Sequence, residues 1–201
     1  MEYEGIILSG KQGVGKTSVA EALVELIEEE TDGRVEIIPF AEALKDAVSR
    51  TIDGFREAGL INTDELPKDL KRPAHQTIGQ GLRDHYPNIW VDTWLYKAQN
   101  NDALVVNDDA RYPNEIRKIA NNGFFTVRLK ASRELRAQRI ELTGEDHDSE
   151  TALDDFDEDE YDLVVDQDQL VRLDGVESTP ESIAQDIWDV IKFEERTQTA
   201  V

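Results

Sequence analysis

The sequence predicts an α/β fold built on a parallel sheet. Short apolar runs alternate along the chain with longer segments of helical periodicity, which is the order of βαβ units. The apolar runs are continuous, as in strands that are buried on both faces of a sheet. With 201 residues, 39% of them hydrophobic, the chain is long enough for one domain with a sizeable core. We therefore expect a single domain over residues 1–201.

Five segments are predicted as strands because each is a short apolar run. They cover residues 5–9, 35–40, 103–107, 124–129 and 162–166. The runs 5–9 and 103–107 are followed by glycine or charged residues, which are candidates for a functional site. The alternation with helical segments predicts that these strands run parallel.

Two helices are predicted from the spacing of their apolar residues. The first covers 16–30, where the apolar positions are Val19, Ala20, Leu23, Leu26 and Ile27. The last covers about 180–195, with Thr179 as its N-cap and Pro180 at its first helical position. Its buried face is expected to consist of Ile183, Ile187, Val190 and Ile191.

Two segments interrupt the regular alternation. Residues 41–102 lie between the second and third predicted strands and are far too long for a simple crossover, so they predict a helical sub-domain. Residues 140–171 contain 14 Asp and Glu, one His and no Lys or Arg. The centre of this acidic segment, 154–159, is expected to be a solvated or mobile loop.

A phosphate-binding loop (P-loop) follows the first strand. The pattern G-x-x-x-x-G-K-[ST] is complete, and with the next residue it gives the nucleotide-binding candidates Gly10, Lys11, Gln12, Gly13, Val14, Gly15, Lys16, Thr17 and Ser18. Glycines let the backbone turn its N–H groups around phosphates, and the following helix directs its positive end at the same anion. Lys16 is expected to reach the β- and γ-phosphates of ATP, and the Thr17 hydroxyl to bind Mg²⁺.

A second polar site follows the third strand. There the sequence reads Asp108-Asp109-Ala110-Arg111, and carboxylates at the end of a neighbouring parallel strand would lie beside the P-loop. One of them could hold the magnesium shell, and Arg111 could reach a phosphate. The alternative is an Asp-rich turn that caps the next helix, which Asn114 and Glu115 would merely begin.

Composition excludes several classes of function. The 44 acidic residues outnumber the 22 basic ones, and the net charge of −22 disfavours binding to a nucleic-acid polymer. Cysteine is absent, which excludes disulfides and thiolate sites. No apolar run approaches the roughly 20 residues of a membrane span, and the acidic N-terminus is unlike a signal peptide. We expect a cytoplasmic protein with no membrane partner, adapted to high salt, although an ordinary acidic protein is the alternative.

Among P-loop classes, a small-molecule kinase fits best. The sequence has neither the N-K-x-D nor the D-x-x-G motif of a GTPase, and a remodelling ATPase would usually be larger. A kinase needs an acceptor pocket and a lid that excludes water, which 41–102 and 130–160 respectively could supply. In the second of these, Arg133, Arg136 and Arg139 would fan across one side of a helix and close over the transferred phosphoryl group. The alternative is a solvated basic face, or pairing of these arginines with the acidic segment.

Four motifs, in order along the chain, resemble those of bacteriophage deoxynucleoside monophosphate kinases. They are F-A-E-A-L-K from Phe40 to Lys45, Q-T-I-G-Q-G-L-R from Gln76 to Arg83 followed by W-V-D at Trp90, D-A-R-Y-P-N-E from Asp109, and S-E followed by Leu153 around Glu150. The last motif is shared with animal-type phosphomevalonate kinases. This chain has two adjacent acids, Asp108 and Asp109, where the family usually shows one, and the family pattern points to Asp109.

The resemblance implies phosphoryl transfer from ATP to a deoxynucleoside monophosphate. It implies a P-loop three-layer sandwich with a parallel five-stranded sheet, order 2-3-1-4-5, a helical acceptor-binding insertion (41–102) and a lid (130–160). Lys16, Asp109, Arg111 and at least one lid arginine would be catalytic, and Thr17 and Asp109 would organise Mg²⁺. The expected acceptor residues are Phe40, Lys45, Arg72, Gln76, Arg83, Trp90, Arg111 and Glu150, although Trp90 could equally be core because Trp94 follows it at helical spacing.

The alternatives left open are a kinase for another phosphate ester, such as phosphomevalonate, and a nucleotide-binding switch or assembly ATPase without an acceptor. The expected partners are small nucleotides, and a homodimer is left open. A phage-like enzyme with this charge suggests a virus of a salt-loving microbe.

Overall fold

The computed structural model describes residues 3–59, 68–142, 148–169 and 178–198 of the chain. In this part of the chain, five parallel strands form one sheet in the order β2-β3-β1-β4-β5. The strands are β1 (Gly5–Ser9), β2 (Val35–Ile37), β3 (Leu104–Ala110), β4 (Phe124–Lys130) and β5 (Leu163–Asp166). The expected parallel sheet and its strand order are confirmed.

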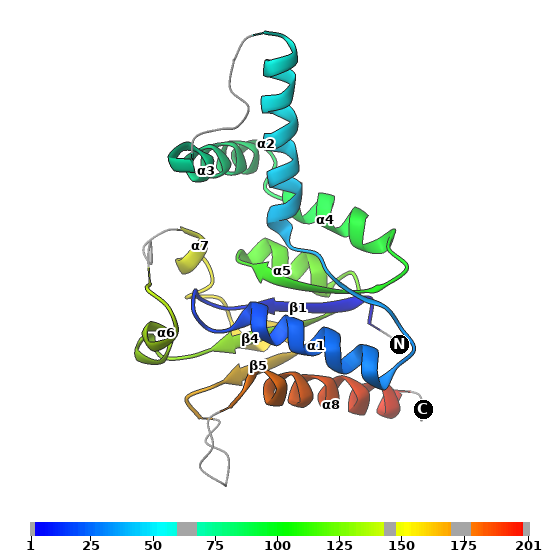
Figure 1. The fold of residues 1–201 in the computed structure, drawn as a ribbon. Coiled ribbons are helices and arrows are strands. Elements are labelled where there is room, and N and C mark those ends of the chain that lie inside the picture. The colour runs from blue at the N-terminus through cyan, green and yellow to red at the C-terminus, as the bar shows by residue number, and fades with distance from the viewer. Residues whose placement is uncertain (1–2, 60–67, 143–147, 170–177, 199–201) are drawn as a thin grey trace.

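Helices cover both faces of the sheet and extend beyond it. They are α1 (Lys16–Glu30), α2 (Phe40–Glu57), α3 (Lys68–His85), α4 (Ile89–Gln99), α5 (Pro113–Ala120), α6 (Arg133–Arg139), α7 (Asp148–Thr151) and α8 (Pro180–Gln198), with a 3₁₀ turn η1 at Glu158–Glu160. Figure 1 shows α1 and α8 side by side along one face of the sheet, α4 and α5 on the other, and α2 standing away from it with α3 nearby.

Two apolar clusters hold the three layers together. On one face, Leu23 of α1 and Ile187 of α8 pack with Val106 and Phe125 of the sheet. On the other face, α4 and α5 pack against strand residues that point the opposite way, such as Ile7 and Val105. Successive strand residues thus alternate between the two clusters, which confirms the predicted three-layer sandwich.

The predicted terminal helices are confirmed nearly residue by residue. α1 has the expected bounds, and α8 begins as predicted at Pro180 and continues to Gln198. The hydroxyl of Thr179 accepts a hydrogen bond from the Ser182 N–H group at 3.2 Å, which is the expected N-cap contact. The periodicity did not identify Trp188, which is buried on α8 and donates to Glu30 at 2.9 Å.

Two expectations about local structure were wrong in detail, and a third was right in part. The second strand ends at Ile37, and Phe40 begins α2 instead of ending the strand. The insertion is helical as predicted, but α4 belongs to the sandwich itself, because its Trp94 packs between Phe40 and Phe124 at centroid distances of 5.1 and 5.0 Å. The acidic stretch 154–159 is exposed except for Phe156, as expected of a solvated loop, but the buried Phe156 and ion pairs such as Lys130–Glu158 at 2.8 Å anchor it.

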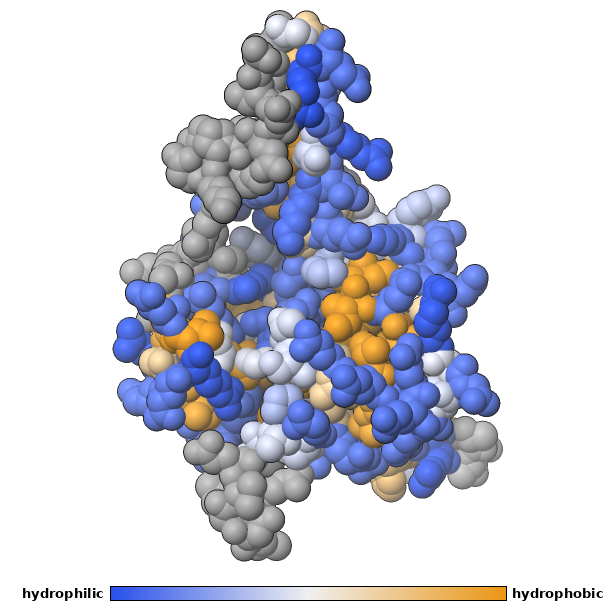
Figure 2. Space-filling model, in the orientation of Figure 1, coloured by the Kyte–Doolittle hydropathy of each residue, from blue (hydrophilic) through white to orange (hydrophobic). Residues whose placement is uncertain are grey.

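The surface is dominated by hydrophilic residues in the view of Figure 2. This accords with the charged composition, in which one residue in three is Asp, Glu, Lys or Arg. Within the ranges that the structure describes, no helix combines the length and the apolar character needed to cross a bilayer.

Candidate active site

The P-loop connects β1 to α1 at the carboxyl edge of the sheet, next to α6 and α7 (Figure 1). Gly13 and Gly15 have φ angles of 79° and 96°, a region that glycine enters without a steric penalty. Gly15 occupies the N-cap position of α1, where no side chain caps the free N–H groups. The positive end of α1 therefore faces the loop, an arrangement that attracts anions.

Lys16 is held inside the loop. Its Nζ donates to the carbonyl oxygens of Gly10 at 2.6 Å and Lys11 at 3.1 Å, and the residue is only 8% exposed. Burial, assisted by the charge of Arg111, lowers the pKa of Lys16 to about 8, while the nearby carboxylates oppose that change. The loop thus keeps a poorly solvated ammonium group in place, which a bound polyphosphate would stabilise.

The two adjacent acids after Asn107 point in different directions. β3 continues to Ala110, but its register with β1 shifts between Asn107 and Ala110, and the two acids in this irregular stretch have different partners. Asp108 accepts a hydrogen bond from the Thr17 hydroxyl at 2.7 Å. Asp109 accepts from the backbone N–H groups of Phe40 and Ala41 at the start of α2. The pairing expected for Thr17 and Asp109 is therefore replaced by one between Thr17 and Asp108.

Two of the three predicted lid arginines contact the P-loop. The expected helix is present as α6, and Arg136, which is buried, donates to the Gln12 carbonyl at 3.0 Å. Arg139 donates to the Val14 carbonyl at 3.2 Å and to the Gln167 side chain at 2.9 Å. Arg133 lies on the exposed side of α6. The structure thus brings Arg136 and Arg139 to the donor side of the site.

Glu150 on α7 places a carboxylate at the P-loop. One of its oxygens accepts from the Gln12 N–H group at 2.8 Å, and the other forms an ion pair with Arg111. Nearby, Lys11 and Asp154 form an ion pair at 2.7 Å. The expectation placed Glu150 among the acceptor residues, whereas here it contacts the loop that would receive ATP.

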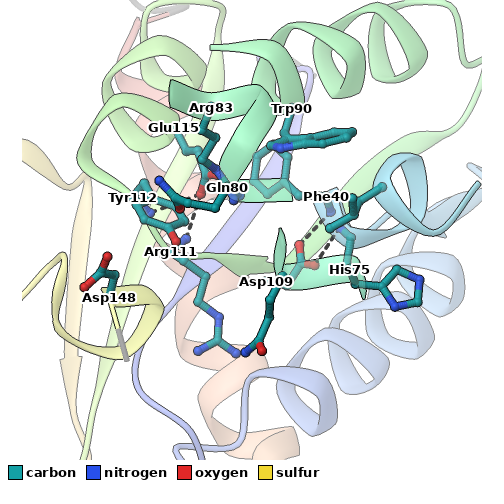
Figure 3. A pocket seen from close by; sticks show the side chains of 13 residues that line it. Phe40, His75, Gln80, Arg83, Trp90, Asp109, Arg111, Tyr112, Glu115 and Asp148 are labelled. Carbon is teal, nitrogen blue, oxygen red and sulfur yellow. Dashed lines mark hydrogen bonds and ion pairs between the residues drawn. The ribbon is translucent and has the colours of Figure 1, made fainter. Parts of the chain in front are cut away.

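A cavity of about 350 Å³ opens beside the P-loop (Figure 3). Its volume is in the range of sites for small molecules. Five of the predicted acceptor residues line it, namely Phe40, Gln76, Arg83, Trp90 and Arg111. Lys45 is exposed on α2 and is not among the lining residues, and the side chain of Arg72 lies outside the described part of the structure.

Trp90 satisfies both readings of its sequence position. It is 5% exposed, as a core residue would be, and its ring nitrogen donates to the Gly79 carbonyl at 3.1 Å. It also lines the cavity, where Figure 3 shows it between Gln80 and Phe40. Trp94, by contrast, is a core residue and donates to the Ile38 carbonyl at 2.6 Å.

Several lining residues were missed by the sequence analysis. They include His75, Gln80, Tyr112, Glu115 and Asp148. Gln80 lies one helical turn after Gln76, a spacing that could have identified it. Tyr112 and Glu115 lie within the D-A-R-Y-P-N-E motif, but neither was named as an acceptor residue, and Glu115 was allowed to be only the start of a helix. Their place in the cavity becomes visible once Arg83 of α3 lies against both of them.

Arg83, Tyr112 and Glu115 form a group at one end of the cavity (Figure 3). The Arg83 guanidinium lies 4.4 Å from the centre of the Tyr112 ring and 3.6 Å from the Glu115 carboxylate. Glu115 also accepts from the N–H groups of Arg111 at 2.8 Å and Tyr112 at 3.1 Å. Burial raises the pKa of Glu115 to about 7 despite these contacts, so Arg83 is held by an acid that is only partly ionised near neutral pH.

Comparison with known proteins finds similarity at the level of structure alone. No family model matches the sequence, and no curated protein matches it. Among solved structures, a shikimate kinase from Acinetobacter baumannii, in complex with shikimate, is 18% identical with a TM-score of 0.54 over 94% of this chain and 93% of its own. A gluconokinase from Sinorhizobium meliloti 1021 is 18% identical with a TM-score of 0.54 over 100% and 99%.

A third similar structure is an APS kinase from Mycobacterium tuberculosis in complex with AMPPNP and APS. It is 14% identical, with a TM-score of 0.50 over 96% of this chain and 99% of that one. These similarities concern the fold. In this chain the complete P-loop sequence follows the end of β1. The chain has the fold of the P-loop kinases that act on small molecules.

Proposed function

We propose that this protein transfers a phosphoryl group from ATP to a deoxynucleoside or nucleoside monophosphate and forms the diphosphate. The observation that carries the proposal is the cavity beside the P-loop, because two arginines, Arg83 and Arg111, line it together with aromatic and amide side chains. Paired guanidinium groups suit a phosphate monoester, and the remaining surface suits a planar base.

The donor side fits ATP. The uncapped N-terminus of α1, the glycine conformations of the loop and the ammonium group of Lys16 together form a cradle for a polyphosphate. Thr17 and Asp108 offer two hard oxygen donors 2.7 Å apart, and magnesium prefers such ligands in company with phosphates and water. Magnesium would neutralise charge on the transferred group. Asp108 replaces Asp109 in our assignment of this role.

The acceptor side needs no general base, because a phosphate oxygen is already anionic at neutral pH. Arg83 and Arg111 would hold that phosphate, with Arg83 oriented by Glu115 and Tyr112. Gln76, Gln80 and Trp90 would contact the base. Catalysis would then consist of positioning and charge neutralisation, to which Lys16, Arg111 and the lid arginines contribute.

The lid would exclude water from the transfer. Arg136 and Arg139 already bind the outer side of the P-loop, and α7 reaches across it through Glu150. A closed lid limits wasteful hydrolysis of ATP, which a kinase with a small acceptor must avoid.

The proposal is tested by measuring ADP release with a panel of acceptors. The panel comprises the deoxynucleoside and nucleoside monophosphates, phosphomevalonate, and the shikimate, gluconate and APS of the similar structures, with a reaction that lacks any acceptor. Acceptor-dependent ADP with a nucleoside monophosphate is expected. Strong release without acceptor would contradict the proposal in favour of an ATPase, and a preference for phosphomevalonate would favour the other phosphate-ester kinase.

The donor site is tested by the Lys16→Ala variant. Its turnover should fall by at least about 100-fold, because the charge that faces the transferred group is lost. Lys97→Ala is the matched control, since Lys97 is an exposed lysine on α4 whose ammonium pairs with Glu42. Circular dichroism of both variants should match the wild type. Unchanged turnover in Lys16→Ala would exclude the donor site assigned here.

A further inference from the structure

Asp108 and Asp109, at the end of β3, contact different parts of the site. We propose that Asp109 is a positioning residue whose carboxylate fixes the start of α2, and with it the acceptor side of the cavity, while Asp108 alone serves the metal. This inference rests on the function proposed above. It differs from the sequence expectation, in which Asp109 organised magnesium.

The contacts of Asp109 are those of a helix cap. Its two oxygens accept from the N–H groups of Phe40 at 2.6 Å and Ala41 at 3.0 Å, which are the first residues of α2. The N-cap position itself is Pro39, which has no side-chain acceptor and makes no cap hydrogen bond. The first N–H groups of a helix need partners, and α2 obtains them from a residue 69 positions further along the chain.

A buried network holds Asp109 in this orientation. The Asn107 amide donates to Asp109 at 3.2 Å and to the Ile38 carbonyl at 2.9 Å. Trp94 of α4 donates to the same Ile38 carbonyl at 2.6 Å. The connection from β2 to α2 is thus fixed from β3 and from α4 at once, just before the residues that Asp109 caps.

The consequence reaches the acceptor cavity because the first turns of α2 form part of its wall. Phe40, Ala41 and Leu44 all line the cavity, and Asp109 lies at its base (Figure 3). A change in the cap would therefore tilt or fray that wall, leaving the P-loop and Thr17 in place. A substitution of Asp109 would then change the position of the acceptor without changing the position of the donor.

A role for Asp109 in metal binding is disfavoured by its contacts. Both oxygens already accept backbone hydrogen bonds, and one of them also accepts from Asn107. Asp108 instead accepts from the Thr17 hydroxyl, which is the P-loop oxygen that would itself bind magnesium.

The test compares Asp109→Asn with Asp108→Asn, two substitutions of the same type at neighbouring positions. An asparagine at 109 presents an NH₂ group to one of the two helix N–H donors, so one hydrogen bond is lost and two donors face each other. We expect the KM and the calorimetric Kd of the best nucleoside monophosphate to rise about tenfold or more. The magnesium concentration for half-maximal rate should change by less than about twofold.

Asp108→Asn should do the reverse. The magnesium requirement should rise about tenfold or more, and the acceptor Kd should stay within about twofold of the wild type. A readout independent of catalysis is amide hydrogen exchange at Phe40 and Ala41. Exchange there should accelerate about tenfold or more in Asp109→Asn and should not change in Asp108→Asn.

An increased magnesium requirement in Asp109→Asn, or unchanged exchange at Phe40 and Ala41, would overturn the proposal. If Asp109→Asn does not fold, Asp109→Glu keeps the charge but displaces the carboxylate, and it should give the same pattern of raised acceptor Kd with unchanged magnesium dependence. Should the wild type accept no nucleoside monophosphate, the proposed function fails, while hydrogen exchange still decides the positioning role.

Discussion

Lys16 makes the strongest quantitative prediction, because its charge is kept in a site that burial disfavours. Burial and Arg111 lower its pKa from 10.5 to about 8. That difference corresponds to about 3 kcal/mol. Between pH 8 and 10.5 the unfolded chain retains this proton and the folded protein does not, so the stability contributed by this group rises with pH. At neutral pH the folded protein carries the full cost, which a bound polyphosphate would offset.

ATP binding should therefore draw a proton onto Lys16. With a pKa of about 8 in the free protein, and a much higher one next to a polyphosphate, uptake should be about 0.1 proton at pH 7, about 0.5 at pH 8 and about 0.9 at pH 9. Titration calorimetry with a non-hydrolysable ATP analogue measures this number when each titration is repeated in two buffers that differ in ionisation enthalpy.

The control is Lys16→Arg, which keeps a positive charge that does not titrate in this range. It should bind the analogue without the increase in proton uptake between pH 7 and 9, whatever its affinity. Proton uptake near zero in the wild type at both pH 8 and pH 9 would refute the reasoning. It would mean that the buried lysine is stabilised as fully in the empty loop as in the occupied one.

Three further predictions concern the acceptor end, the lid and the surface. Burial raises the pKa of Glu115 from 4.5 to about 7. The free energy of unfolding of the wild type, relative to that of Glu115→Gln, should therefore fall by about 3 kcal/mol as the pH rises from 4.5 to above 7. Urea unfolding at several pH values measures this difference, and a difference that does not change with pH would contradict the prediction. Glu150→Gln removes the negative charge that faces the Gln12 N–H group and Arg111, where a phosphate of ATP would otherwise bind. ATP should therefore bind about tenfold more tightly to this variant by calorimetry. Weaker binding would show that the Glu150 carboxylate does not compete with ATP for these groups. Molar KCl should raise the melting temperature, because a net charge of −22 repels itself at low ionic strength; a scan that shows no gain would remove the expected adaptation to salt.

The fold could be predicted from the sequence because its signals are local. β1 and α1 have the predicted bounds, because a continuous apolar run and a helical spacing of apolar residues can each be recognised within a short segment. The P-loop between them is a contiguous pattern that needs no distant partner. For the same reason the cap of α8 by Thr179 was found, because the acceptor and its donor are three residues apart.

The errors occurred where a distant partner decides local structure. Residues 35–40 look like one apolar strand, yet α2 begins at Phe40 because Asp109 satisfies its first N–H groups. The cavity likewise combines α2, α3, the end of β3 and α7, segments that meet only in three dimensions. Glu150 shows the same limit, since its contact with Gln12 spans 138 residues. Sequence spacing indicated that such residues matter without indicating what each would touch.

Asp108 and Asp109 show that a position in a sequence motif does not determine what its side chain contacts. Aligned on Arg111, the resemblance to the phage kinases selects Asp109, because Asp109 is two residues before the arginine. The contacts, however, place Asp109 with Asn107 at the start of α2, while Asp108 accepts from Thr17 at the start of α1. The register of β3 with β1 shifts at these residues, so strand alternation alone would not have assigned the two directions. The two acids therefore have different hydrogen-bond partners, although the charges of both raise the pKa of Lys16 against the effect of burial. In this chain two adjacent residues of β3 contact the donor loop and the acceptor wall respectively, and a substitution at either position should affect only one of the two.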